Sequence, residues 1–441
     1  MIKKEHNKIA FINARIVDPD SGLDGLGELI VHNKLIKDVG RNLLNGSIPE
    51  DHLIINCKNN ILCPGLIDMC SHLREPGEEY KENIESASKA ALSGGITSMI
   101  CMPDTNPIID QISVIEFIAR RARETNGVKI FPSASVTKGL QGKELTEIGL
   151  LQEAGAILFT EGDQALSNTK IMKQALEYAK TFDALIVQHP QDKDLSANGA
   201  MNSGALASKL GLPGISKVAE IIQVEKDLRL IENTGGKIHF INITTKEAIL
   251  AINKAKKNGL NVSCSTSPHY FNSTEDSVDE WKTFAKVTPP LRKEEDRKYI
   301  FDALINRNID LITSHHSPQD QDSKRIPFEQ AEFGIIGLET LLPLSMELHF
   351  KGKMQIIDII DKLSNKPAKL LNLKSGMLKK NYPADILIFD PNYSYKLNID
   401  KIKSKSKNTL YENYNMRGKV LATIVDGRLM YKSSKFKIKS I

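Results

Sequence analysis

The stretch GLIDMCSHLREPG, residues 65–77, joins a short apolar run to a group of polar side chains. Asp68, Cys70 and His72 alternate along it, and alternate residues of a β-strand lie on the same face. Thiolate and imidazole are both good zinc ligands, so this spacing at a strand end suits a divalent metal. The stretch therefore predicts a strand that ends in a metal-binding pair, with Arg74 following in the turn.

Short apolar runs like this one recur along the chain and are separated by longer amphipathic segments. Such alternation indicates repeated βα units and a parallel sheet. Eight runs close a (β/α)8 TIM barrel, whose active site lies at the carboxyl ends of the strands. The eight runs are GLIDM, GITSMICM, VKIFPSASV, GAILFT, ALIVQH, KIHFINIT, NVSCSTS and IDLITSHH.

The segments between the runs have the pattern of helices. In DQISVIEFIARRARETNG, apolar residues recur at spacings of three and four, which predicts one buried helix face. Asp110 can cap the start of this helix, and Gly127 stands just past its end.

The two ends of the chain differ from the middle, because their sequence pattern predicts short strands and shows no helical periodicity. We therefore expect residues 1–63 and 365–441 to pack together beside a barrel formed by residues 64–364. In the second segment, Asp426 and Gly427 form a two-residue hairpin signal.

The composition is that of a soluble globular protein, with 41% hydrophobic and 26% charged residues among 441. The net charge of +5 is a small remainder of 59 basic and 54 acidic side chains. This small net charge predicts no nucleic-acid-binding surface. The lysines at 401–407 are interpreted as a solvated face. Five cysteines without a CxxC pair, and no apolar run of membrane-spanning length, favour a cytoplasmic protein without disulfides.

Polar residues follow several of the later strands, in FTEGD, VQHP, HFINITT, STSPHY and TSHHSPQ. A single histidine at a strand end is usually a hydrogen-bonded structural residue, and His239 and His269 are interpreted in this way. The cysteines other than Cys70 lie in apolar contexts and are expected in the core.

Four longer motifs carry a resemblance to a known family. They are LIDMCSHLREPGEEYKENIESASKAALSGGITSMICMPDTNPIID, TKGLQGKELTEIGLLQEAGAILFT, TFAKVTPPLRKEEDR and FGIIGLETLLPL. Together they resemble the class I dihydroorotases of the amidohydrolase superfamily over nearly the whole chain. The resemblance implies that the terminal strands form a small β-sandwich beside the barrel.

The resemblance also implies a ligand set, which this chain keeps only in part. The implied metal ligands are Cys70, in place of a histidine, and His72, Glu161 and His189. Whether Glu161 or Asp163 supplies the carboxylate stays open. A further histidine of the family falls on Asn242, which binds zinc poorly, so at most one zinc ion is expected, or none. The catalytic aspartate of the family falls on His315, which is the candidate general base and an alternative ligand of a single zinc ion beside Cys70, His72 and His189.

The implied substrate-binding residues are changed as well. Arg74 matches the arginine that pairs with the substrate carboxylate in the family, and His316 is retained from the strand-eight motif. An asparagine of the family is Asp104 here, and a carboxylate at that place repels an anionic substrate or must take up a proton. A second asparagine of the family is Thr288.

Two main functions follow from this combination of retained and changed site residues. The first is a non-catalytic dihydroorotase homologue that serves as a structural partner of aspartate carbamoyltransferase in an oligomeric assembly. The alternative is an active zinc dihydroorotase with a variant ligand set, which interconverts carbamoyl-aspartate and dihydroorotate. A third reaction, hydrolysis of a hydantoin or allantoin ring, needs the same metal.

Overall fold

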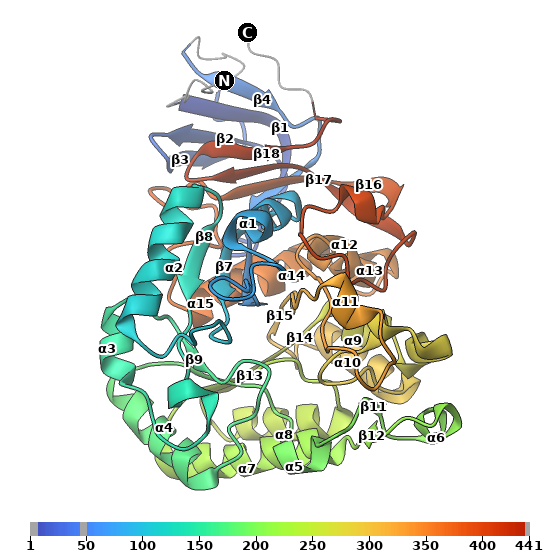
Figure 1. Ribbon diagram of the computed structural model, residues 1–441. Coiled ribbons are helices and arrows are strands. Elements are labelled where there is room, and N and C mark those ends of the chain that lie inside the picture. The colour runs from blue at the N-terminus through green and yellow to red at the C-terminus, as the bar shows by residue number, and fades with distance from the viewer. Residues whose placement is uncertain (1–7, 45–50, 437–441) are drawn as a thin grey trace.

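The computed structural model describes residues 8–44 and 51–436. A sheet of terminal strands lies at one end of the molecule, and a ring of strands surrounded by helices forms the remainder (Figure 1). Both ends of the described chain lie at the sheet end.

The ring consists of parallel strands in two hydrogen-bonded groups, β6-β7-β8 and β15-β14-β13-β10-β9. Parallel bridges from Ala134 to Phe159 and from Ser71 to His316 join the two groups at both ends. The eight runs of the sequence are these strands, so the predicted barrel is confirmed. Their bounds are β6 Leu66–Ser71, β7 Ile96–Cys101, β8 Lys129–Pro132, β9 Phe159–Thr160, β10 Ile186–Gln188, β13 Ile238–Phe240, β14 Val262–Thr266 and β15 Leu311–Ile312.

Helices follow the barrel strands and cover their outer side (Figure 1). The longer ones are α1 Ile84–Ser93, α2 Ile112–Thr125, α3 Ile148–Glu153, α4 Thr169–Thr181, α7 Val218–Thr234, α8 Lys246–Lys257 and α10 Glu294–Ile305. Shorter elements are α5 Lys193–Ser196, β11 Met201–Asn202, α6 Ala205–Leu210, β12 Gly214–Ile215, α9 Pro268–Asn272, α11 Gln321–Lys324, α12 Leu341–Ser345, α13 Glu347–Phe350, α14 Ile356–Ile360 and α15 Lys366–Leu370.

The predicted caps of α2 are wrong. Gln111 is its N-cap residue and makes no side-chain capping bond. The Asp110 carboxylate instead accepts a hydrogen bond from the Gly139 backbone amide at 2.9 Å, so it joins two loops at the barrel mouth. At the other end, Asn126 rather than Gly127 takes the left-handed conformation, with φ of 49°, which asparagine tolerates better than most residues.

The terminal strands form one sheet of eight strands. The order is β18-β17-β16-β5-β1-β2-β3, and β4 pairs with β1. Asp426 and Gly427 form the turn between β17 and β18 with φ of 47° and 69°, which confirms the predicted hairpin. The bounds are β1 Lys8–Asp18, β2 Leu23–His32, β3 Leu35–Gly40, β4 Leu53–Asn56, β5 Ile61–Pro64, β16 Ile386–Lys396, β17 Asn415–Val425 and β18 Arg428–Lys432.

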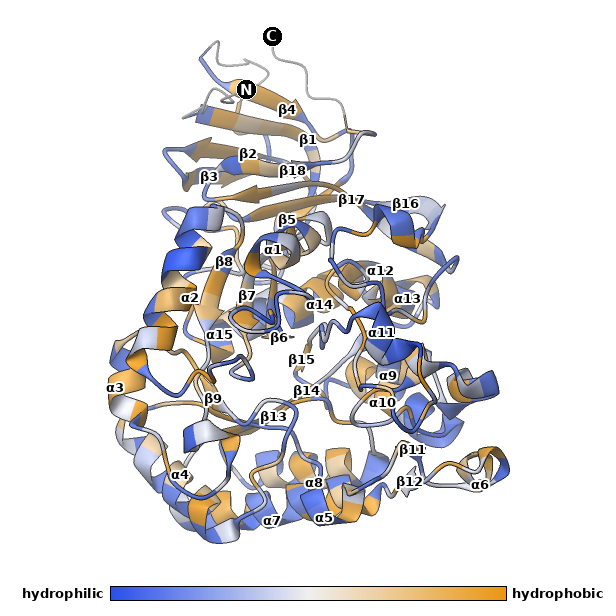
Figure 2. Cartoon of the chain, in the orientation of Figure 1, coloured by the Kyte–Doolittle hydropathy of each residue, from blue (hydrophilic) through white to orange (hydrophobic). Residues whose placement is uncertain are grey.

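Apolar burial explains this arrangement. Outer helices such as α4 and α7 carry both hydrophobic and hydrophilic residues (Figure 2), and Met172, Leu176 and Val224 of these helices are fully buried. The terminal sheet has its own apolar cluster, which includes Phe11 and Ile388. No helix in the described ranges is long and apolar enough to cross a membrane.

Candidate metal and substrate site

Closure of the barrel brings the first and last strands together at the site. The His316 amide donates to the Cys70 carbonyl at 3.1 Å, and the His72 amide donates to the His316 carbonyl at 2.9 Å. As a result, the ligand atoms of Cys70, His72 and His315 all lie within 4.8 Å of one another. All three side chains are buried. Residues at opposite ends of the barrel sequence thus form a cluster with metal-ligand chemistry.

Three residues at the strand ends around this site have left-handed backbone conformations. The φ angles are 61° for Arg74, 56° for Asn242 and 48° for His315. Residues other than glycine rarely adopt such φ angles. Strained backbone conformations of this kind are concentrated at functional sites. These residues are therefore held in place by their surroundings rather than by their own preferences.

Asp163 is the carboxylate that joins the cluster. Its Oδ2 lies 3.2 Å from His72 Nε2, outside hydrogen-bonding geometry, and its Oδ1 lies 3.2 Å from His315 Nε2. Burial alone would raise the pKa of Asp163, but the charges of His72 and His315 hold it well below its usual range. Asp163 thus carries a negative charge between two imidazole rings.

Glu161 faces away from this cluster. Its carboxylate accepts hydrogen bonds from the Thr137 amide and the Thr137 hydroxyl, each at 2.8 Å. Gly162 separates the two acids with φ of 70°, a turn that sends the neighbouring side chains in different directions. Of the two acids, Asp163 therefore lies against the cluster, and Glu161 supports the loop after β8.

His189 follows β10 and is buried, and neither of its ring nitrogens has a hydrogen-bond partner among the described residues. Burial lowers its pKa to about 4 against the opposing effect of the Asp163 charge, and the charges of His315 and His72 lower it further. The ring is therefore neutral at pH 7. A neutral imidazole with free nitrogens is the form that binds a metal or accepts a proton.

Asn242 occupies the end of β13 and is fully buried. Its Oδ1 accepts a hydrogen bond from the Ser267 hydroxyl at 3.0 Å, while its Nδ2 has no partner in the described chain. Since the amide oxygen is engaged by Ser267, the group left free is an NH2 donor, which is not a metal ligand. Thr288, in contrast, accepts from Gln191 Nε2 at 3.3 Å.

Asp104 connects His72 to Arg74. Its two oxygens lie 2.8 Å and 2.7 Å from His72 Nδ1, and Arg74 donates to Oδ2 at 3.0 Å. Burial alone would raise the pKa of Asp104, but His72 and Arg74 hold it below its usual range. Likewise, burial would lower the pKa of His72, but Asp104 and Asp163 raise it well above its usual value. The Arg74 charge is thus already neutralised within the protein.

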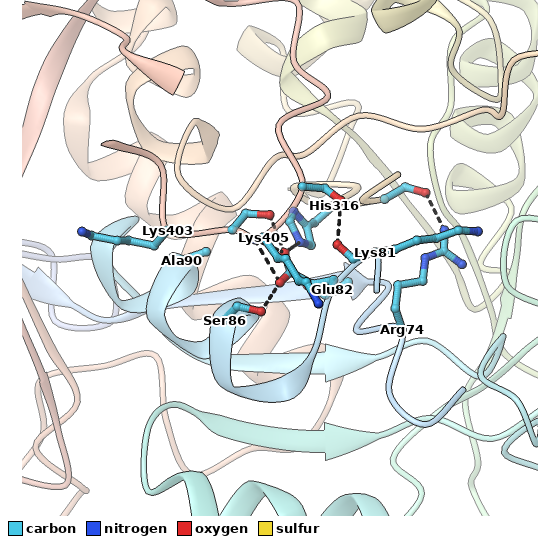
Figure 3. Close-up of polar contacts among 12 residues, drawn as sticks. Arg74, Lys81, Glu82, Ser86, Ala90, His316, Lys403 and Lys405 are labelled. Atoms are coloured by element: carbon cyan, nitrogen blue, oxygen red, sulfur yellow. Dashed lines mark hydrogen bonds and ion pairs between the residues drawn. The ribbon is translucent and has the colours of Figure 1, made fainter. Parts of the chain in front are cut away.

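His316 does not share these contacts. Its Nδ1 accepts from the Gly337 amide at 3.2 Å, and its Nε2 lies 3.5 Å from the Glu82 carboxylate. Figure 3 shows Glu82 between His316 and Ser86, with Arg74 further along the same loop. The ring of His316 is therefore directed to Glu82, which sequence reasoning did not single out.

His315 has two aromatic neighbours from α9. The Tyr270 hydroxyl lies 3.4 Å from His315 Nδ1 and donates to the Pro289 carbonyl at 3.0 Å. The ring of His269 stacks on His315 with centroids 5.6 Å apart. Tyr270 was not identified from the sequence, although its place at the end of STSPHY, after the seventh barrel strand, was a usable signal. These contacts fix the orientation of His315.

A parallel eight-stranded barrel with thiol, imidazole and carboxylate groups at its carboxyl ends is typical of metal-dependent amidohydrolases. A family model described as dihydro-orotase-like matches residues 59–248. The dihydroorotase of Wolbachia sp. subsp. Brugia malayi is 41% identical over 431 residues, with 97% of each chain covered. That of Syntrophus aciditrophicus is 41% identical over 424 residues, covering 96% of this chain and 99% of the relative. The chain belongs to the dihydroorotase family.

Solved structures agree with this fold. The L-hydantoinase (dihydropyrimidinase) from Arthrobacter aurescens superimposes with a TM-score of 0.85 at 21% identity, covering 98% of this chain and 97% of that one. The dihydropyrimidinase from Brevibacillus agri gives a TM-score of 0.82 at 19% identity, covering 97% and 96%. At these identities the likeness concerns the fold alone, a TIM barrel of the amidohydrolase type.

Proposed function

We propose that this chain is a hydrolase of pyrimidine metabolism that binds one zinc ion and interconverts carbamoyl-aspartate and dihydroorotate. The observation that carries the proposal is the buried cluster of Cys70, His72 and His315, with donor atoms within 4.8 Å of one another. Identity of 41% over nearly the full length of proteins named dihydroorotase supports the reaction class.

The donor set fits zinc chemically. One thiolate, two imidazoles and one carboxylate are all zinc ligands, and Asp163 lies 3.2 Å from both histidines. Burial raises the pKa of Cys70 to about 12, so the thiol must lose its proton when a metal binds. Asn242 supplies no ligand, which limits the site to one ion. We assign His315 to the ligand set, because it lies in the cluster, and not to the general base predicted from the sequence.

A bound zinc ion supplies a polarised amide carbonyl and a water of lowered pKa. The residues of the chain supply the rest of the site. His189 is neutral and has free ring nitrogens, so it can accept a proton from that water or contribute a further ligand. Asp163 balances the positive charge, and buried apolar side chains such as Ile100, Leu185 and Ile241 limit the access of bulk water from the barrel interior.

A second function is favoured by a specific observation. Arg74 is paired with Asp104 at 3.0 Å, and the ionised Asp104 would repel the carboxylate of either substrate. This pairing supports the non-catalytic alternative, in which the chain is a structural partner of aspartate carbamoyltransferase.

One set of assays separates the two functions. Purified protein is loaded with zinc, freed of excess metal, and assayed for dihydroorotate hydrolysis, with His72→Ala as the inactive control. Turnover that the control lacks supports the hydrolase. Absence of turnover, together with co-elution with aspartate carbamoyltransferase in size exclusion, supports the structural partner and overturns the hydrolase.

A further inference from the structure

The lysine-rich segment near the C-terminus reaches the site, although its sequence suggested only a solvated face. In residues 402–408, IKSKSKN, burial alternates: Ser404, Ser406 and Asn408 are buried, while Lys403 and Lys405 are exposed. This is the period of an extended strand with one face against the protein. We refer to residues 402–408 as the strap.

The strap binds the loop that follows β6. Glu82 in that loop is fully buried, and its carboxylate accepts hydrogen bonds from the Ser404 hydroxyl and from the Lys405 amide (Figure 3). One residue earlier, the Lys81 carbonyl accepts from the Ser406 hydroxyl at 2.6 Å. The loop that begins at His72 is thereby attached to the strap at two adjacent residues.

The strap also binds the loop that follows β15. The buried Asn408 amide donates to the Ser317 carbonyl at 3.0 Å and to the Gly334 carbonyl at 3.1 Å. Its Oδ1 accepts from the Gln319 amide at 3.1 Å. Asn408 therefore supplies the hydrogen bonds that this irregular loop lacks in itself, and a buried backbone needs such partners.

Glu82 connects the two loops a second time. Besides its bonds to the strap, it faces His316 Nε2 at 3.5 Å, and His316 adjoins His315 in the chain. The backbone of His316 is hydrogen bonded to both Cys70 and His72. One buried carboxylate thus links the strap to the strand ends that carry the cluster.

From these contacts we infer that the strap is a positioning element of the site, with Glu82 and Asn408 as positioning residues. It fixes the distance between the end of β6 and the end of β15, which is the distance on which the Cys70, His72 and His315 cluster depends. The C-terminal region therefore completes the barrel mouth as well as the terminal sheet. The inference uses the proposed function only for the role of the residues that the strap positions.

Alkylation of cysteine tests the strap without any metal. Cys70 is buried at the site, and Cys57 is buried in the core of the terminal sheet. In excess EDTA, Asn408→Ala is expected to raise the iodoacetamide labelling rate of Cys70 at least about tenfold, since lost hydrogen bonds lower the free energy of local opening. Labelling of Cys57 should stay unchanged, as peptide mass spectrometry would show.

Three further variants keep the test decisive. Ser406→Ala removes one hydrogen bond and applies if Asn408→Ala fails to fold, while Ser406→Thr keeps the hydroxyl and should restore slow labelling. Lys403→Ala, on the exposed face of the strap, should leave both cysteines at wild-type rates. Unchanged Cys70 labelling in both Asn408→Ala and Ser406→Ala, or a parallel rise at Cys57, would overturn the inference.

Zinc affinity gives a separate readout. If the strap positions the ligands, Asn408→Ala should weaken zinc binding by about 10- to 100-fold, the usual effect of removing a supporting contact around a metal site. Failure of the wild-type protein to bind zinc would contradict the proposed function, whereas the strap is judged by the alkylation result alone.

Discussion

The two sides of the barrel mouth differ in how completely their polar groups are paired. At the ends of β6, β7, β9 and β15, His72 and Arg74 share the Asp104 carboxylate, and Asp163 lies against His72 and His315. At the ends of β10 and β13, within the described chain, both ring nitrogens of His189 and the Nδ2 of Asn242 have no hydrogen-bond partner. On the first side, His72 Nε2 and Arg74 Nε also lack a hydrogen bond among the described residues, but each belongs to a side chain that is otherwise paired. A buried polar group without a partner is costly, which suggests that a ligand satisfies the second side.

The largest effect on stability is expected from replacing His72, whose charged imidazole lies between Asp104 and Asp163. His72→Ala removes a fully buried imidazole and leaves the half-buried Asp104 and Asp163 without their main counter-charge, so the metal-free protein should lose about 3–5 kcal/mol of unfolding free energy. Urea unfolding in EDTA measures this loss. His32→Ala, at an exposed position in β2, is the control and should change stability little. A loss below about 1 kcal/mol would show that the ion pairs do not form.

The contributions of His189 and His72 to folding stability should also change with pH in opposite directions. The pKa of His189 is lowered to about 4 in the folded protein, below the value of about 6.5 in an unfolded chain. The unfolded state then binds more protons between pH 6.5 and 4, so stability falls as pH falls, by up to about 3 kcal/mol. For His72 the pKa is raised, so its contribution is full below pH 6.5 and is lost as pH rises through the folded pKa.

A variant at His189 isolates the slope between pH 6.5 and 4. Unfolding free energy is measured against pH in EDTA for the wild type and for His189→Gln, which removes the titrating ring. The variant should lose the decline between pH 6.5 and 4. If both proteins show the same slope there, His189 is not held neutral by burial.

A third prediction concerns Arg74, which should become free to bind a substrate carboxylate when Asp104 is replaced. Asp104→Asn removes the carboxylate that occupies Arg74, so binding of carbamoyl-aspartate should tighten about 10- to 100-fold through a charge-assisted pair. Isothermal titration measures the affinity. Glu78→Gln is the matched control, because Glu78 also contacts Arg74, at 3.3 Å, without touching His72. Equal affinities for Asp104→Asn and wild type would exclude electrostatic blocking by Asp104.

The smallest effect is expected at the carboxylate that faces away from the cluster. Glu161→Gln should cost about 1 kcal/mol of stability, the scale of its Thr137 hydrogen bonds, and change zinc affinity less than about twofold. Asp163→Asn should weaken zinc binding at least about tenfold. Competition titrations with a chelating dye compare the two variants, and the reverse ranking would return Glu161 to the ligand set.

The barrel could be predicted from the sequence because each buried strand is a short apolar run between turn residues, as in ALIVQH and KIHFINIT. The site was harder, because its geometry depends on distant pairs. Asp104 meets His72 across 32 positions, and the turn at Gly162 decides which acid enters the cluster. The caps of α2 were missed because the Gly139 amide competes for Asp110.

The strap, too, could be predicted only in part from the sequence. Lys401, Lys403 and Lys405 are exposed, as interpreted from the sequence, but Lys407 is half-buried, and Ser404, Ser406 and Asn408 are buried. A period of two within a charged segment was a readable signal. The partners of these buried side chains, Lys81, Glu82 and Ser317, lie far from the strap in the sequence, so only the fold reveals them.

The central claim is that Cys70, His72 and His315 hold one zinc ion, and the most direct measurement is X-ray absorption at the zinc edge on stoichiometrically loaded protein. The account predicts about one zinc per chain with a single sulfur neighbour at about 2.3 Å, and loss of that neighbour in Cys70→Ser. No retained zinc, two ions per chain, or a zinc shell without sulfur would contradict it.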